Sequence, residues 1–162
     1  MPVIPRQTLV ASSLLDRLMD DQPQNAVEAS SEMLYDVSRY KQAVARDLES
    51  LLNTRCAYAD DELLEPFPRT RDSLLRYGIM DLSSLSLLNP EHRMHLRDSI
   101  RRTIERHESR LAKVRVNLEV SRDQNQMLRF RVDALLRVHP SRPPVTFDAM
   151  LQLSSSTYHV KD

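Results

Sequence analysis

One stretch, from Asn89 to Val138, constrains the fold of this chain more than any other. It opens with Asn89-Pro90-Glu91, which is typical of a helix start. Asparagine can cap a helix, proline loses nothing at the first helical position, and an acid suits the positive first turn. Apolar residues then recur at helical spacing, with arginines at many of the other positions: Leu96, Ile100, Ile104 and Leu111. The stretch therefore begins with an amphipathic helix that buries one side.

The hydrophobic period changes from helical spacing to strict alternation at Lys113. Apolar residues occupy every second position from Val114 to Val120, and again from Leu128 to Val138 after the polar residues Arg122-Asp123-Gln124-Asn125. Alternation of this kind is typical of strands that bury one face, and polar residues between two such runs favour a turn. We therefore predict an antiparallel hairpin directly after the helix.

Two further elements complete the predicted domain. A second apolar stripe indicates a long helix from Ser31 to Thr54, capped by Ser30 or Ser31: Met33, Val37, Tyr40, Val44, Leu48 and Leu51. After a proline-rich crossing at 139–144, Val145 to Leu153 alternates as a third strand, and 157–160 is interpreted as its continuation. Residues 31–162 are therefore predicted to form one α+β domain, with two main helices packed on a small antiparallel three-stranded sheet.

Residues 1–30 are predicted to be an N-terminal arm outside that domain. The arm carries one apolar patch, Leu14, Leu15, Leu18 and Met19, which is too short to be a stable helix alone. Polar residues typical of a linker follow at 20–25. Two interpretations of the patch stay open, because a short amphipathic segment either docks into a groove of a partner or folds back on its own domain.

The residues between the two predicted helices, from Cys56 to Asn89, show no clear period. Asp60-Asp61-Glu62 is interpreted as a solvated acidic run, and Pro66-Phe67-Pro68 predicts a surface connection without helix. Gly78 is the only glycine of the chain. We expect it at a position where a positive backbone angle or close packing excludes a side chain.

Composition excludes several classes of protein. The formal net charge is zero, so there is no global electrostatic case for binding nucleic acid or an anionic membrane. A single cysteine, Cys56, rules out an internal disulfide framework and is interpreted as a buried structural thiol in a reducing compartment. No apolar stretch resembles a signal peptide or is long enough to span a bilayer, so we expect a cytoplasmic protein without direct membrane insertion.

An enzyme would need catalytic carboxylates, and Glu105 and Glu108 are the best candidates. Helical spacing brings such side chains within about 5–6 Å, which overlaps the separation in retaining glycosidases. Neighbouring arginines, however, favour the ionised form of both carboxylates, which is the wrong form for a general acid. The chain also has no tryptophan, the commonest platform for a sugar. These features disfavour a peptidoglycan-cleaving glycosidase.

Two other kinds of site are also disfavoured. Arg93, Arg97 and Arg101 share one helical face that could grip phosphates, but zero net charge argues against a nucleic-acid-binding protein. His92 and His95 lie close together on the same helix, but no third ligand follows at useful spacing. We therefore expect neither a metal nor any other cofactor.

Glu108-Ser109-Arg110 lies where the predicted helix gives way to the first strand. At such a junction residues two apart can point the same way, so Glu108 and Arg110 can present a paired acid and base. Two interpretations stay open. The pair can set the register of a partner strand through charge-assisted hydrogen bonds, or it can hold the junction of its own domain.

Four short motifs, in this order, resemble those of one family: Ser13-Leu14-Leu15-Asp16-Arg17-Leu18, Leu51-Leu52-Asn53-Thr54-Arg55, Tyr77-Gly78-Ile79-Met80-Asp81-Leu82 and Glu108-Ser109-Arg110-Leu111. Together they resemble the TssE family, the baseplate wedge subunits of type VI secretion systems. These subunits are members of the lysozyme-like baseplate family of contractile phage tails. The family signature is Glu-Pro-Arg, so Ser109 replaces a proline here, and Met80 stands where the family usually has a second proline.

The resemblance implies an α+β fold, no catalytic activity, and a cytoplasmic baseplate assembled at the inner membrane. It implies that the chain joins the wedge proteins TssF and TssG to the sheath proteins TssB and TssC. An interaction role is carried over to Glu108 and Arg110 only. The family match suggests structural positions for five other residues: Asn53, Arg55, Tyr77, Gly78 and Asp81. The alternative functions are a peptidoglycan-cleaving lysozyme-like enzyme and a nucleic-acid-binding protein with a basic helix.

Overall fold

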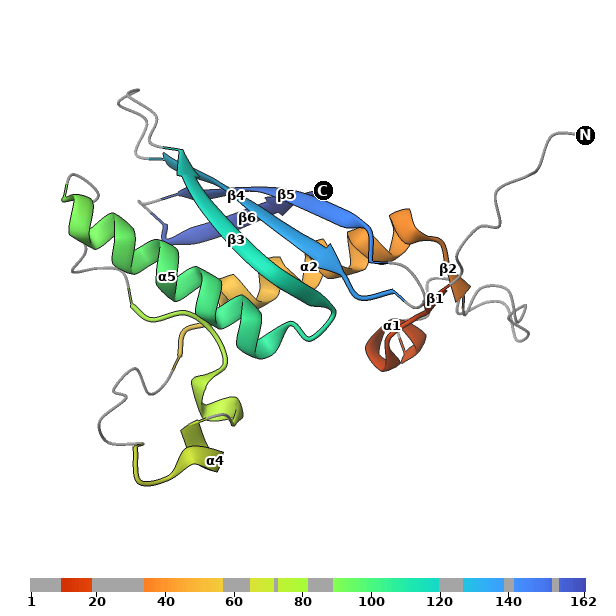
Figure 1. Ribbon diagram of the computed structural model, residues 1–162, viewed down its shortest axis with the longest axis horizontal. Helices are drawn as coiled ribbons and strands as arrows, with labels where there is room; N and C mark the ends of the chain where they lie inside the picture. Colours follow the sequence, from red (N-terminus) through yellow and green to blue (C-terminus); the bar gives the residue numbers. More distant parts are fainter. Residues whose placement is uncertain are drawn as a thin grey trace, which may run out of the picture. The chain divides into compact units, whose positions relative to one another are not determined.

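The computed structural model describes residues 10–18, 34–56, 65–71, 73–81, 89–119, 127–138, 142–152 and 155–162. Within these ranges the architecture is α+β, as predicted, with one two-stranded sheet and one four-stranded sheet (Figure 1). The chain divides into two compact units, Met1–Val44 and Ala45–Asp162. The boundary predicted at residue 30 between an arm and a domain stays a prediction.

The first unit contains a small sheet and a short helix. Strand β1 (Val10–Ala11) pairs antiparallel with β2 (Leu34–Tyr35), and helix α1 spans Leu14–Leu18. Ser13 and Asp16 cap α1 reciprocally, because Ser13 Oγ accepts from Asp16 N at 3.1 Å and Asp16 Oδ2 accepts from Ser13 N at 3.2 Å. The capping hydrogen bonds stabilise a helix that is too short to be stable by propensity alone.

Helix α2 (Val37–Asn53) begins later than the predicted start at Ser31. Asp36 is the residue that caps it, since its Oδ1 accepts from Arg39 N at 2.7 Å, while the two residues before Asp36 belong to β2. The serines predicted to cap the helix lie outside the described residues. The predicted apolar stripe is confirmed at four positions that are buried: Tyr40, Val44, Leu48 and Leu51.

The large sheet belongs to the second unit and has the strand order β3-β4-β5-β6, with every neighbouring pair antiparallel. Its strands are β3 (Leu111–Glu119), β4 (Met127–Leu136), β5 (Pro144–Gln152) and β6 (Thr157–Lys161). The prediction of three strands is therefore wrong. The chain turns at Ser156, whose φ is 52°, so the segment predicted to continue β5 folds back beside it as β6.

Strand β3 begins at Leu111, which the helical spacing had assigned to the preceding helix. The register with β4 shifts between Ala112 and Arg115, and Lys113 there has a positive φ of 54°. An extra residue in one strand is a β-bulge, which bends the strand and increases its twist. The turn predicted at 122–125 lies outside the described residues.

Two helices lie along the sheet in the second unit. Helix α5 (Pro90–His107) packs against β3, and residues 45–53 of α2 run beside β6 (Figure 1). Asn89 caps α5 as predicted, accepting from Glu91 N at 2.8 Å. Alternate residues of β4 and β5 are buried and those between them are more exposed. The most buried large side chains are Leu48, Leu52, Ile79, Leu96, Ile100, Ile104, Leu128, Phe130, Leu136, Phe147, Leu151 and Tyr158.

The connection between α2 and α5 contains short helical turns. Helix α4 (Pro68–Arg71) begins at a proline, and the 3-10 turn η1 (Leu74–Arg76) follows it. The prediction of a connection without helix is therefore wrong, because proline suits the first position of a helix although it breaks the interior. The acidic run 60–62 lies outside the described residues.

Candidate functional site

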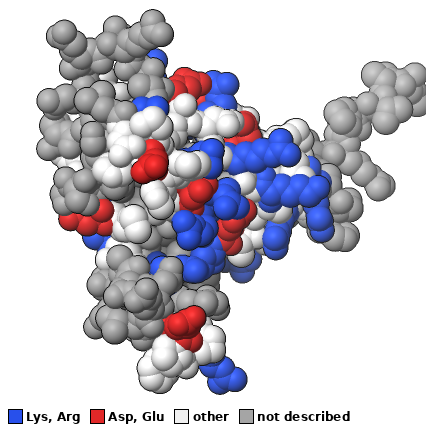
Figure 2. Space-filling view, turned by 60° about the vertical axis from the view of Figure 1, so that its left-hand side comes forward, with Lys and Arg blue, Asp and Glu red and all other residues white. Residues whose placement is uncertain are grey.

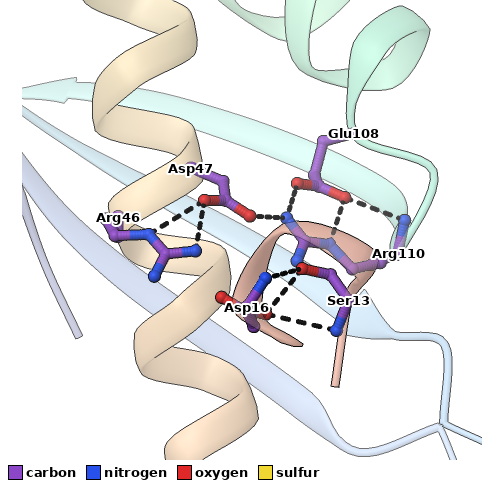
Figure 3. Close-up of polar contacts among 6 residues, drawn as sticks. All are labelled: Ser13, Asp16, Arg46, Asp47, Glu108 and Arg110. Carbon is purple, nitrogen blue, oxygen red and sulfur yellow. Dashed lines mark hydrogen bonds and ion pairs between the residues drawn. The ribbon is translucent and has the colours of Figure 1, made fainter. Parts of the chain in front are cut away.

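Glu108 and Arg110 form the centre of a cluster of charged side chains in the second unit (Figure 3). Helix α5 ends at His107, and the Glu108 N–H still donates to Ile104 O at 2.8 Å. The Glu108 carboxylate then accepts from the backbone N–H of Arg110 at 3.0 Å, from its Nε at 2.7 Å and from its Nη2. The sequence prediction of an acid and base facing the same way is confirmed.

Asp47 completes the cluster from α2. Arg110 Nη2 also donates to Asp47 Oδ2 at 2.7 Å, and the guanidinium of Arg46 donates to Asp47 Oδ1 at 2.9 and 3.1 Å. Arg110 therefore links the start of β3 to α2 as well as to the end of α5. Sequence reasoning missed Asp47, because an acid beside a core leucine in a helix gives no signal of its distant partner.

Burial and opposite charge act against each other at Arg110. The side chains of Glu108 and Arg110 are only 8% and 17% exposed. Burial alone would lower the pKa of Arg110, but hydrogen bonds to Glu108 and Asp47 and their charges outweigh it, so the pKa is raised. The guanidinium stays charged and is held by two carboxylates of its own chain. This arrangement favours a role at the junction of the domain itself.

Gly78 lies where no side chain would fit. Its φ is 103°, and a Cβ atom built on it would lie 2.3 Å from the carbonyl oxygen of Thr54. The prediction for Gly78 is confirmed on both counts, the positive angle and the close packing. Ile79 beside it is fully buried and exchanges backbone hydrogen bonds of 2.9 Å with Thr54 and Cys56.

Tyr77 lies beside the end of α5 and close to the charged cluster. Its ring meets the ring of His107 edge-on, with 5.2 Å between centroids. Burial raises the pKa of Tyr77, and the charges of Asp47 and Glu108 raise it further. Asp81 follows the same segment and is exposed. Cys56 is half-buried rather than buried as predicted, and its Sγ lies 3.6 Å from Leu75 O.

Side chains of α2 and of the residues just after it bond to the outer edge of β6. The Asn53 amide donates to Tyr158 O at 2.9 Å and accepts from Tyr158 N at 2.8 Å, as a neighbouring strand would. Glu49 Oε2 accepts from Val160 N at 2.8 Å, and Arg55 Nη2 donates to Ser156 O at 2.9 Å. This edge of the sheet is therefore occupied by the protein's own side chains.

The other edge of the sheet is formed by β3, beside which lies a groove of about 470 Å³. Residues of α5 and β3 line the groove: Pro90, Arg93, Met94, Arg97, Val116, Asn117 and Leu118. The N–H groups of Tyr158 and Val160 bond to side chains of α2, so they point away from β5. At the end of β4, the Leu136 N–H bonds to Pro143 O on the β5 side and the Arg137 N–H bonds to Arg110 O on the β3 side. Because these directions alternate along antiparallel strands, the peptide groups of Val116 and Leu118 point away from β4.

The leucines of the predicted docking segment are exposed. Leu14, Leu15 and Leu18 all lie on α1, in the first unit, while Asp16 on the same helix is buried. Three exposed leucines on a short capped helix form an apolar surface that is costly to leave in water. The contact of these leucines with a partner stays a prediction.

The carboxylates considered for catalysis, and part of the basic face of α5 considered for phosphate binding, form ion pairs within the chain. Glu105 pairs with Arg101 at 3.3 Å and Glu108 pairs with Arg110, so each carboxylate is bound by an arginine of its own chain. On the basic face of α5, Arg97 also pairs with Asp98 at 3.0 Å. Figure 2, turned to bring the α5 side forward, shows acidic side chains among the basic ones on this face.

Neither a metal site nor a membrane-spanning helix is found in the part of the chain that the structure describes. No three His, Cys, Asp or Glu side chains there are grouped so as to hold a metal ion. None of the described helices is long and apolar enough to cross a membrane.

A family model described as baseplate wedge protein gp25 matches residues 38–141. The chain belongs to this gp25 family. The matched residues include Asn53, Gly78 and the whole cluster of Asp47, Glu108 and Arg110. Proteins of the gp25 family are mainly structural components of baseplates that interact with other baseplate proteins, although a similarity to lysozyme is known for the family. No curated protein matches the chain significantly.

Proposed function

We propose that this protein is a non-enzymatic, TssE-type subunit of a type VI secretion baseplate. It links the wedge proteins TssF and TssG to the sheath proteins TssB and TssC and promotes sheath assembly in the cytoplasm, within a baseplate assembled at the inner membrane. The family match over residues 38–141 carries this proposal, since it covers the α5–β3–β4 core and the charged cluster.

The sheath contact is assigned to the edge of β3. Edge strands offer unpaired peptide groups to which an extended segment can add, and side-chain pockets beside them supply specificity. At the β6 edge, the side chains of Asn53 and Glu49 already bond to the peptide groups. The β3 edge instead borders the groove lined by α5. A strand or arm of a sheath protein therefore joins the sheet beside Val116 and Leu118.

Glu108 and Arg110 act on this contact by placing β3. Their hydrogen bonds fix the first residues of the strand against α2, immediately before the bulge at Lys113. The register that an incoming strand meets is thereby set from within the chain. The exposed leucines of α1, Leu14, Leu15 and Leu18, dock separately onto the wedge proteins.

The test is co-purification of the tagged full chain from cells that make TssF, TssG, TssB and TssC. Leu118→Pro removes an N–H that points away from β4 and keeps the ladder to β4, whereas Leu118→Ala shortens the same side chain and keeps the N–H. We expect Leu118→Pro, but not Leu118→Ala, to lose TssB and TssC while retaining TssF and TssG. Equal recovery of the sheath proteins by the two variants would contradict the strand-addition mechanism.

A second arm of the experiment addresses α1. Deletion of residues 1–20 is expected to weaken recovery of TssF and TssG without changing the thermal unfolding of the domain. A large fall in melting temperature would instead show that the segment packs in the core. If the wild-type chain recovers none of the four proteins and cleaves peptidoglycan in the same assay, the lysozyme-like alternative is correct.

A further inference from the structure

Three large apolar side chains are exposed along the connection between α2 and α5. Phe67 is 60% exposed, Leu74 is 82% exposed and Leu75 is 46% exposed. They lie on or next to α4 and η1, which project away from the sheet in Figure 1. Clustered exposed apolar side chains mark interaction sites on soluble proteins more often than scattered ones do.

Local hydrogen bonds fix the turn that carries the two leucines. Ser73 caps η1, since its Oγ accepts from Leu75 N at 3.3 Å and donates to Thr70 O at 2.6 Å. The backbone N–H of Ser73 also donates to Thr70 O at 3.1 Å, which ties η1 to α4. The exposed leucines therefore sit on a hydrogen-bonded turn, and binding would cost little ordering of its backbone.

The turn is also anchored to the body of the second unit. His107 Nε2 donates to Arg76 O at 2.9 Å, and Thr103 Oγ1 donates to Gly78 O at 3.3 Å. Immediately beyond, Gly78 is packed against Thr54 and Ile79 is fully buried. The anchor lies at the C-terminal end of α5, whereas the groove beside β3 is lined by the N-terminal half of that helix.

Arginines lie near the exposed leucines, with Glu65 as an exposed acid just before Phe67. Arg69 on α4 is exposed, and Arg76 ends η1. Arg76 and Arg106 both lie close enough to His107 for their charges to lower its pKa, which places them at the anchor of the turn. An apolar projection with arginines around it is complementary to an apolar hollow with carboxylates around it.

We propose that Phe67, Leu74 and Leu75 dock into a concave apolar surface bordered by carboxylates on a wedge protein. This inference rests on the proposed function and adds to it a contact separate from α1 and from the β3 edge. The wedge is assigned rather than the sheath because the proposed sheath contact lies at the β3 edge, whose groove is lined by the opposite half of α5. Buried leucine and phenylalanine side chains supply the affinity, and the arginines give it charge specificity.

The experiment measures retention of co-expressed TssF and TssG by the purified full chain. In the test variant Leu74→Asp is combined with Leu75→Asp, and Met127→Asp, at an exposed apolar position on β4, is the matched control. We expect the double variant to lose at least about tenfold in retained wedge protein, because several buried anchors carry most of an interface. The control variant should retain TssF and TssG as the wild type does. The double variant should still retain TssB and TssC, and its melting temperature should be unchanged.

Charge provides an independent measurement of the same contact. Arg69→Glu is expected to weaken retention of the wedge proteins, and added salt should weaken the wild-type contact more than that of the variant. Retention of TssF and TssG by the double variant at the wild-type level would overturn the inference and leave the proposed function intact. Loss of TssB and TssC alone would overturn it as well, while failure of the wild type to retain any wedge protein would contradict the proposed function itself.

Discussion

The guanidinium group of Arg110 lies between the carboxylates of Glu108 and Asp47, in a largely buried position. Glu108 and Asp47 both accept from it, and the Glu108 side chain is 8% exposed. Removing Arg110 leaves the buried Glu108 carboxylate without the arginine that it pairs with, which costs more than the pair contributes when complete.

Arg110→Ala is therefore expected to lower the free energy of unfolding by about 2–4 kcal/mol. Glu108→Ala should cost less, because Arg110 keeps Asp47 as a partner. The control is Arg131→Ala, at an ion pair with Asp148 whose side chains are 47% and 69% exposed, and we expect it to leave the free energy of unfolding almost unchanged because exposed ion pairs contribute little. Urea denaturation measures all three, and an equal effect of Arg110→Ala and Arg131→Ala would show that the cluster contributes nothing special.

His107 makes the anchor of η1 sensitive to pH. Burial lowers the pKa of His107, the hydrogen bond to Arg76 O raises it, and the charges of Arg106 and Arg76 lower it further, so the pKa lies below its ordinary value. The unfolded chain then binds more protons near and below about pH 6.5, and the folded state loses stability as the pH falls through this range.

His107→Gln should reduce this dependence, since glutamine can donate to the Arg76 carbonyl without titrating. The free energy of unfolding, measured by urea at about pH 7.5 and about pH 5.5, should fall more for the wild type than for the variant. His95→Gln, at an exposed position on α5, is the control and should behave as the wild type. The same fall in wild type and His107→Gln would mean that other groups cause the pH dependence.

Sequence reasoning at this scale found residues that interact locally and missed their distant partners. Glu108 and Arg110 are two positions apart, and their pairing followed from the helix-to-strand junction. Asp47 bonds to Arg110 across 63 positions, and no local pattern encodes that contact. Gly78 was predictable because a lone glycine is itself a local signal of backbone geometry.

At the scale of elements, the two edges of the large sheet are treated differently. Asn53 bonds both peptide groups of Tyr158, so the edge of β6 resembles the edge of a strand that already has a neighbour. Protein edges that stay unpaired invite association with other chains, and side chains that cover them prevent it.

Asn53→Ala is expected to destabilise the domain by about 1–3 kcal/mol, because two backbone groups lose their partner. It should also increase self-association at high concentration, measured by light scattering and size-exclusion chromatography. Asn117→Ala is the matched control, since the Asn117 amide donates to the side chain of Asp133, at 3.2 Å, in an exposed hydrogen bond rather than to the backbone of a strand. A monomeric and stable Asn53→Ala chain would show that α2 does not protect the edge.

Elements with a strong period were predicted and those set by geometry were not. The start of α5 and the β3–β4 pairing followed from capping and alternation over many residues. The start of α2 was misplaced because Asp36, not a serine, caps the helix, and β6 was merged with β5 because a turn at Ser156 has no proline or glycine to mark it. Leu111 fits both the helical spacing and the strand, so the boundary between them was ambiguous.

At the scale of the whole molecule, the α+β class followed from a helix, a hairpin and a further strand in order. Which edge of the sheet is covered could not be predicted, because that depends on contacts such as Asn53 with Tyr158, separated by 105 positions. The candidate interfaces are equally non-local. The groove beside β3 forms only when α5 and β3 pack together, and the anchored leucines of η1 need both α2 and α5.

A sheet with one covered edge can be extended by an added strand at its other edge only. If a partner strand adds at β3 as proposed, it finds no second site at β6, so the large sheet of each subunit accepts one added strand. Two large sheets that meet edge to edge through β3 form a closed pair, and growth ends there. The arrangement therefore favours counted assembly over open-ended polymerisation.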